Sequence, residues 1–341
     1  MLEQLVNHIK GLRKISGQEA QMRVCMMGPR AVGKTSVLTA VFAETQNTIA
    51  NTRLKMGASD ITATTLQERK NELSGIFERR ELPNAGIAAT SNVQVFDFNF
   101  GIFGKESRVQ LNITDFPGEY VRREPLKVIE YIKESSAIFI AVDTPYLMEE
   151  NGRFAQKNAI EEVTNFFLKA TEEIINEKMI LFIPLKCEKY FYEHRMDEVN
   201  EAVQTYYKVL IDYLQNKNVF CAITPILTVG GIEFDRFVSS QDIVGTKSTD
   251  TMAVTSIFKY RKNGEYKPLY CVQPVYYLLS FVAAQYQREK KRKNILQRMI
   301  SGLYEMFENE QEFVEEVLKL NRFVKRSEDG YQILIGKELL K

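Results

Sequence analysis

The sequence predicts an α/β protein whose mostly parallel β-sheet carries helices on both faces. Six short apolar runs alternate with longer segments of helical periodicity, the pattern of strands that are connected by helices. The run MILFIP is apolar on both faces, as a strand covered by helices on each side must be. The six runs are Arg23–Met27, Val93–Phe100, Val109–Thr114, Ala137–Val142, Met179–Pro184 and Val219–Leu227.

Two of these runs predict one antiparallel strand within the sheet. Val93–Phe100 and Val109–Thr114 both alternate between apolar and polar residues. Only Gly101–Arg108 separates them, which is too short for the crossover helix that a parallel connection needs. We therefore expect the two runs to pair as a hairpin.

Residues 1–22 are predicted to form an N-terminal amphipathic helix, and residues 23–231 are predicted to form the core domain. The core domain carries a helical insertion over about residues 40–88. Within this insertion, Thr64 or Thr65 could cap a helix whose apolar residues follow at helical spacing.

Residues 232–341 are predicted to form a mainly helical C-terminal extension. The helical patterns cover Pro274–Met306 and Glu308–Leu320, and Tyr331–Ile335 has the pattern of a last short strand.

Length and charge exclude several classes of protein. At 341 residues the chain has room for one large domain or two small ones, since a domain averages about 150 residues. Its 45 Lys and Arg balance 44 Asp and Glu, which argues against nucleic-acid binding because that requires a basic excess. No apolar stretch approaches the roughly 20 residues of a membrane span. The first residues also lack the apolar core of a secretory signal, so we expect a cytoplasmic protein.

The cysteine and histidine content argues against two further kinds of site. The four cysteines are scattered without C-x-x-C spacing, and the chain has only two histidines. Zinc ligation and hydrolase triads that use histidine are therefore not expected.

A phosphate-binding motif directly follows the first strand. The segment GPRAVGKT matches G-x-x-x-x-G-K-[ST] between a strand and a helical pattern. Gly28 and Gly33 allow successive backbone N–H groups to face one anion, at the positive end of the following helix. Lys34 supplies charge for the β- and γ-phosphates, and Thr35 offers a hydroxyl to Mg²⁺. The residues expected to bind nucleotide here are Gly28, Pro29, Arg30, Ala31, Val32, Gly33, Lys34, Thr35 and Ser36.

A second phosphate-sensing element is predicted where the hairpin ends, in the segment DFPGE. Asp115 follows a sheet strand beside the phosphate loop, where a carboxylate can hold Mg²⁺, usually through water. Gly118 has no side chain, so its backbone can approach a γ-phosphate closely.

With these motifs the chain resembles the Ras-like, translation-factor-related class of P-loop GTPases, whose D-x-x-G strand pairs antiparallel with the strand before it. The segments MMGPRAVGKTS, TDFPGE and PLKCEKY are similar to those of a bacterial group of GTPase-like proteins that are often encoded with stress-response or conflict systems. The resemblance covers about residues 23–231 and implies binding of GTP or GDP with Mg²⁺.

The family places a metal-binding threonine just before the first hairpin strand. By this resemblance Thr90 is the third Mg²⁺ ligand beside Thr35 and Asp115. Because the insertion is longer than is usual in the family, Thr62, Thr64 and Thr65 remain alternatives.

The family reads guanine through an Asn/Thr-Lys-x-Asp motif, for which this sequence has LKCE. Lys186 matches, and its aliphatic stem could pack on a purine ring. Glu188 replaces the aspartate as the carboxylate that would accept two hydrogen bonds from guanine. A last base-contacting loop is expected near Thr228–Gly231.

Hydrolysis requires charge neutralisation and an oriented water. The catalytic residues implied by the resemblance are Lys34, Gly118 and Glu119. The family has Gln at the position of Glu119, and Glu cannot donate a hydrogen bond to the transferred phosphoryl group. We therefore expect slow hydrolysis.

The resulting expectation is a GTP-binding regulatory switch that hydrolyses GTP slowly and is read by a protein partner. A P-loop ATPase and a nucleotide-binding scaffold without turnover are the alternatives.

Overall fold

The structure is a computed structural model, and it describes residues 20–45, 49, 52–82, 93–102, 109–118, 124–169, 175, 177–239, 254–288 and 310–340. Within these residues the chain forms an eight-stranded sheet in the order β10-β7-β6-β5-β1-β4-β3-β2, and a separate two-stranded sheet of β8 and β9. The strands are β1 (Ala20–Met27), β2 (Leu54–Ala58), β3 (Gln94–Ile102), β4 (Val109–Asp115), β5 (Ala137–Asp143), β6 (Met179–Leu185), β7 (Phe220–Ile223), β8 (Ile232–Ser239), β9 (Val254–Tyr260) and β10 (Gln332–Ile335).

Helices connect most of these strands. The α-helices are α2 (Lys34–Thr45), α3 (Asp60–Arg79), α5 (Pro125–Glu134), α6 (Thr144–Met148), α7 (Ile160–Lys169), α9 (Glu188–Tyr192), α10 (Met196–Tyr206), α11 (Lys208–Gln215), α12 (Gln273–Arg288) and α14 (Glu310–Asn321). The short 3₁₀ helices are η1 (Glu149–Gly152), η2 (Ala155–Asn158) and η3 (Lys337–Leu340). None of the described helices is both long and apolar enough to cross a membrane.

The sheet is mostly parallel, as the sequence predicts, and all six predicted strands form. β1 pairs in parallel with β4 on one side and β5 on the other, and β6 and β7 continue in parallel. The predicted hairpin is confirmed, since β3 and β4 pair antiparallel. Two further antiparallel pairs, β2 with β3 and β10 with β7, extend the sheet at its two edges.

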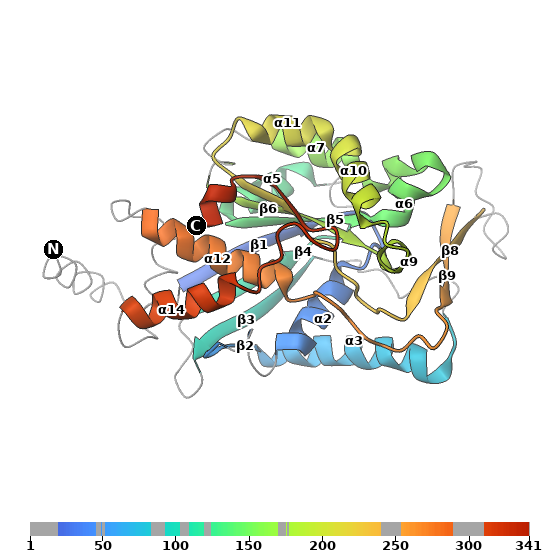
Figure 1. Ribbon diagram of the computed structural model, residues 1–341, viewed down its shortest axis with the longest axis horizontal. Helices are drawn as coiled ribbons and strands as arrows, with labels where there is room; N and C mark the ends of the chain where they lie inside the picture. The colour runs from blue at the N-terminus through green and yellow to red at the C-terminus, as the bar shows by residue number, and fades with distance from the viewer. Residues whose placement is uncertain are drawn as a thin grey trace, which may run out of the picture.

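Helices cover both faces of the sheet (Figure 1). On one face α2, α12 and part of α3 pack against the core, and on the other face α5, α7, α10 and α11 do so. The two faces follow from the alternation of side chains along a strand. In β1, Val24 belongs to the first of these cores and Cys25 to the second.

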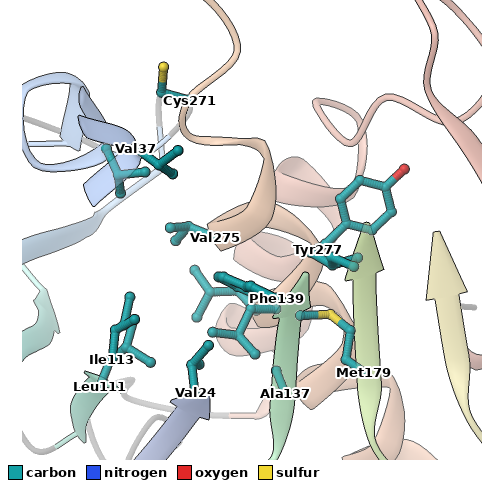
Figure 2. Close-up of a cluster of buried hydrophobic side chains, with 14 of the residues drawn as sticks. Val24, Val37, Leu111, Ile113, Ala137, Phe139, Met179, Cys271, Val275 and Tyr277 are labelled. Atoms are coloured by element: carbon teal, nitrogen blue, oxygen red, sulfur yellow. The ribbon is translucent and has the colours of Figure 1, made fainter. Parts of the chain in front are cut away.

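The region after Gly231 contributes to the main core. In Figure 2, Val275 and Tyr277 of α12 lie over the sheet beside Phe139 of β5, in the same cluster of buried apolar side chains as Val24 of β1. The last strand, β10, pairs with β7. This region also contains the β8–β9 hairpin. This region, predicted to be mainly helical with a last short strand, contains α12 and α14 together with β8, β9 and that last strand, β10.

Three local features differ from the sequence-based expectation. β1 begins at Ala20, inside the segment predicted as an N-terminal helix, and the rest of that segment lies outside the described residues. The insertion contains β2 as well as a helix. That helix is capped by Ser59, whose hydroxyl accepts a hydrogen bond from the Thr62 N–H.

Candidate functional site

The candidate site lies where the direction of the chain across the sheet reverses. β4 and β5 flank β1 on opposite sides, and ligands of open α/β sheets bind at the carboxyl ends of such strands. A cavity of about 340 Å³ opens there. It is lined by the loop after β1 and by residues of α3, β9 and the segments that follow β4, β5 and β6.

The phosphate loop has the backbone that its glycines permit. Gly28 has φ +149° and Gly33 has φ +110°, a region that side chains disfavour. A Cβ atom on Gly28 would lie 2.6 Å from the Ala141 carbonyl oxygen. Glycine at this position therefore lets the loop pass directly over β5. All residues from Arg30 to Ser36 line the cavity.

The side chain of Lys34 folds back into the loop that precedes it. Its Nζ atom donates to the carbonyl oxygens of Gly28 and Pro29, at 3.3 and 3.2 Å. The side chain is 7% exposed, and burial lowers its pKa, an effect that the nearby Asp115 carboxylate opposes. The ammonium group is thus held where the loop lines the cavity.

Asp115 connects the two predicted motifs. Its Oδ2 accepts a hydrogen bond from the Thr35 hydroxyl at 2.9 Å, and its Oδ1 lies 3.9 Å from the Nζ atom of Lys34. Burial raises the pKa of the carboxyl, while Lys34 and Thr35 act in the opposite direction. Among the described residues, Oδ1 has no hydrogen-bond partner.

The side chains of Thr35 and Asp115 are suited to binding Mg²⁺. The ion keeps several waters and needs only one or two protein oxygens when phosphates supply others. A threonine hydroxyl and a carboxylate with an unpartnered buried oxygen meet that need. The described residues contain no group of three or more His, Cys, Asp or Glu that could hold an ion on its own. Mg²⁺ at this position would supply positive charge to the phosphates.

Gly118 lies directly against the phosphate loop. A Cβ atom at this position would be 2.3 Å from the Arg30 backbone nitrogen and 2.7 Å from the Pro29 carbonyl carbon. Because both are backbone atoms, no side chain fits without moving the loop. Gly118 and Pro117 both line the cavity, so the turn after β4 faces the same space as Lys34.

Lys186 lies at a different part of the same cavity, after β6. Its Nζ atom donates to Asp143 Oδ2 at 2.5 Å, and it lies 5.6 Å from the centroid of the Phe258 ring of β9. Its φ of +57° places the residue in the left-handed region. Thr228 and Val229 of the predicted base-contacting loop also line the cavity.

Glu188 does not line the cavity in this structure. Its side chain is 2% exposed, and its Oε1 accepts a hydrogen bond from the Val229 N–H at 3.4 Å. Burial raises the pKa of this carboxyl to about 7, although backbone N–H groups, including that of Gly230, lower it. The carboxylate is thus engaged by the loop beside it.

Thr90 and Glu119 lie outside the described residues. Of the alternatives to Thr90, none lines the cavity. Thr62 accepts a hydrogen bond from the Asp97 N–H, while Thr64 and Thr65 donate to carbonyl oxygens of their own helix. The structure therefore uses these three hydroxyls inside and around α3.

One wall of the cavity was not predictable from the sequence. Apolar side chains of α3 (Leu73 and Ile76) and of β9 (Ile257 and Phe258) form it. No local pattern signals this pairing, because about 180 residues separate the two segments along the chain. Asp143 was also missed, although an acidic residue at the carboxyl end of a parallel strand beside β1 is a signal of the same kind as Asp115.

Neither a protein-family model nor a curated protein sequence matches the chain. Among solved structures, the chain is similar to one described as the S. cerevisiae Ski7 GTPase-like domain, bound to GDP and inorganic phosphate. The identity is 13% and the TM-score is 0.37, over 64% of this chain and 45% of that chain. The chain thus matches less than half of the Ski7 chain.

Proposed function

We propose that this protein binds a nucleoside triphosphate together with Mg²⁺ in the cavity beside the phosphate loop. The observation that carries the proposal is the contact between the two motifs. Thr35 donates to Asp115 at 2.9 Å, beside a buried Lys34 that the loop carbonyls hold. This places a cation, a hydroxyl and a carboxylate at the N-terminus of α2, which favours bound phosphate and Mg²⁺.

The nucleotide that we propose is GTP, and the role is a regulatory switch with slow hydrolysis that a protein partner reads. Lys186 in the cavity and the D-x-x-G turn against the loop support this role. A γ-phosphate near Gly118 would stabilise that turn, and its loss would release it. Slow hydrolysis follows from Glu119 in place of a water-orienting Gln.

The second candidate is an ATP-binding protein, and the burial of Glu188 favours it. Because that carboxylate accepts from the Val229 N–H and does not line the cavity, the guanine-reading group is not presented to the ligand. Competition between labelled GTP and ATP distinguishes the two candidates directly.

The test of triphosphate binding is the Lys34→Ala variant. Removing the ammonium group should reduce Mg²⁺-dependent triphosphate affinity by at least about a hundredfold, since a buried charged hydrogen bond contributes up to about 3 kcal/mol and Lys34 also provides charge to two phosphates. The matched control is Lys208→Ala on α11, where the side chain is exposed and pairs with Asp212 in the same helix.

Affinity is measured by titration calorimetry, and a thermal melt of each variant reports folding. Tight binding retained by a folded Lys34→Ala variant would reject the phosphate-loop assignment. A single-turnover assay of phosphate release on the wild-type protein then separates slow hydrolysis from a scaffold without turnover.

A further inference from the structure

The carboxylate of Asp143 is a buried polar group that the phosphate-binding motifs do not use. It lies at the end of β5, is 1% exposed and lines the cavity. Its Oδ2 accepts the hydrogen bond from Lys186, but its Oδ1 has no hydrogen-bond partner within the part of the chain that the structure describes. A buried acceptor that lacks a donor costs free energy, so a donor from a ligand would remove that cost.

Asp143 is held from two sides. The side-chain amide of Asn158 accepts from the Asp143 N–H at 2.7 Å and donates to its carbonyl oxygen at 3.1 Å. Asn158 is itself fully buried. Lys186 fixes the carboxylate at the other end. A group that is fixed in this way presents its free oxygen without a further cost in ordering.

The negative charge of the Asp143 carboxylate indicates which part of a nucleotide it contacts. Asp143 follows Ala141, whose carbonyl oxygen lies against Gly28, so it lies beyond the start of the phosphate loop along β5. A carboxylate repels phosphate oxygens and accepts from N–H and O–H groups. In a nucleotide those groups belong to the base and the ribose. Tyr146 and Thr228, which can also form hydrogen bonds, line the same cavity.

We propose that Asp143 is a specificity-determining residue whose free carboxylate oxygen accepts a hydrogen bond from an N–H or O–H group of the nucleoside part of the ligand. This inference rests on the proposed nucleotide binding. Asp143, at the end of β5 and next to the phosphate loop, would then recognise the nucleoside. Glu188, by contrast, is engaged by the backbone of the neighbouring loop.

The test compares the wild-type protein with Asp143→Asn, which keeps the shape of the side chain. The matched control is Asp212→Asn, at an exposed aspartate on α11 that pairs with Lys208. For each protein, the affinity is measured by calorimetry with Mg²⁺ for GTP, ATP, ITP, the 2′-deoxy forms of GTP and ATP, and inorganic tripolyphosphate. Tripolyphosphate reports the phosphate end of the cavity alone.

We expect Asp143→Asn to bind the preferred nucleotide about ten- to a hundredfold more weakly, the range for a hydrogen bond to a charged group, with tripolyphosphate affinity unchanged. The analogue that lacks the donor should bind wild type more weakly and lose little more in the variant. Sensitivity to the 2′-hydroxyl would identify ribose as the source, and sensitivity to the exchange of GTP or ATP for ITP would identify the base.

Equal losses for tripolyphosphate and nucleotides would show that Asp143 only supports the fold, and the absence of any loss would also overturn the inference. Wild-type protein that binds neither tripolyphosphate nor a nucleotide would instead reject the proposed function, and the inference with it.

Discussion

At the scale of single residues, Glu188 shows how burial changes a side chain that a motif selects. The motif places a carboxylate where guanine is read in the resembling family, but here the side chain is buried and accepts from the Val229 N–H. Burial raises the pKa of Glu188 to about 7. Its usual value in an unfolded chain is about 4.3, so the folded protein binds the proton more tightly than the unfolded chain does.

The sign of the resulting pH dependence follows directly. At low pH both states are protonated, and Glu188 has no effect on the free energy of unfolding. As the pH rises from about 4.5 to 7, the unfolded state ionises first, and stability is lost. Glu188→Gln removes this titration. We expect the variant to gain roughly 2 kcal/mol over wild type between pH 5 and pH 8, measured by urea unfolding. A constant difference across this range would contradict the burial of an ionisable group.

The residues that line the cavity show how much of the site can be predicted from local sequence. Local sequence places Lys34, Thr35, Asp115 and Gly118 beside the ends of strands, and the structure brings all four to the lining of one cavity. The burial of Glu188 was not predictable in this way, because the position of the Val229 N–H depends on how the loop after β7 packs.

At the scale of elements, the strands with apolar runs and the last strand, β10, were predictable, but the edge strand β2 was not. The buried strands have continuous apolar runs, which identify them without tertiary information. β2 reads LKMGA and has no such run, so it depends on pairing with β3. The sequence predicts the cap of α3 at Thr64 or Thr65, several residues after the observed cap, Ser59. The reason is that the first turn of the helix is largely exposed, with Ile61 83% exposed, and carries little apolar periodicity.

The contact between α3 and the β8–β9 hairpin builds the apolar wall of the cavity. Phe77 of α3 packs against the rings of Tyr260 and Tyr266, at 5.8 and 5.7 Å between centroids. Tyr260 also donates from its hydroxyl to the Ile76 carbonyl oxygen at 2.7 Å. Arg80 donates to the Gly264 carbonyl oxygen at the end of the same helix. The C-terminal end of α3 therefore helps to position β9, while Tyr146 and Phe154 pack against Phe237 of β8.

These contacts make a prediction for Phe77→Ala. Loss of a largely buried ring should destabilise the protein by about 3 kcal/mol. Hydrogen exchange should accelerate in β8 and β9, with β1 and β5 little affected in their relative protection. The control is Ile61→Ala on the same helix, where an exposed side chain should change stability by no more than about 0.5 kcal/mol. Unchanged exchange in the hairpin would show that other contacts hold it.

At the scale of the whole molecule, the C-terminal region contacts the segments around the cavity. Buried Glu316 of α14 accepts from the Arg53 N–H at 2.8 Å, directly before β2, and β2 leads into α3. α12 packs on the face of the sheet that carries α2. None of these contacts follows from local sequence patterns, because each joins segments that are far apart in the chain. They connect the phosphate loop to the C-terminal helices through packed elements.

These connections make the last prediction, which concerns the switch. With Mg²⁺ and a non-hydrolysable GTP analogue, a γ-phosphate near Gly118 should stabilise the turn that packs on the Arg30 backbone. We expect hydrogen exchange to slow around Gly118 and around Thr90, relative to the diphosphate state. Because α3 lines the cavity and contacts both the hairpin and β2, exchange should also change in α3, in β8–β9 or in α14. The diphosphate complex is the control, since it fills the same loop without the third phosphate. A ligand can shift an equilibrium only by its difference in affinity for the two states, so identical exchange with diphosphate and triphosphate would reject the switch and favour a nucleotide-binding scaffold.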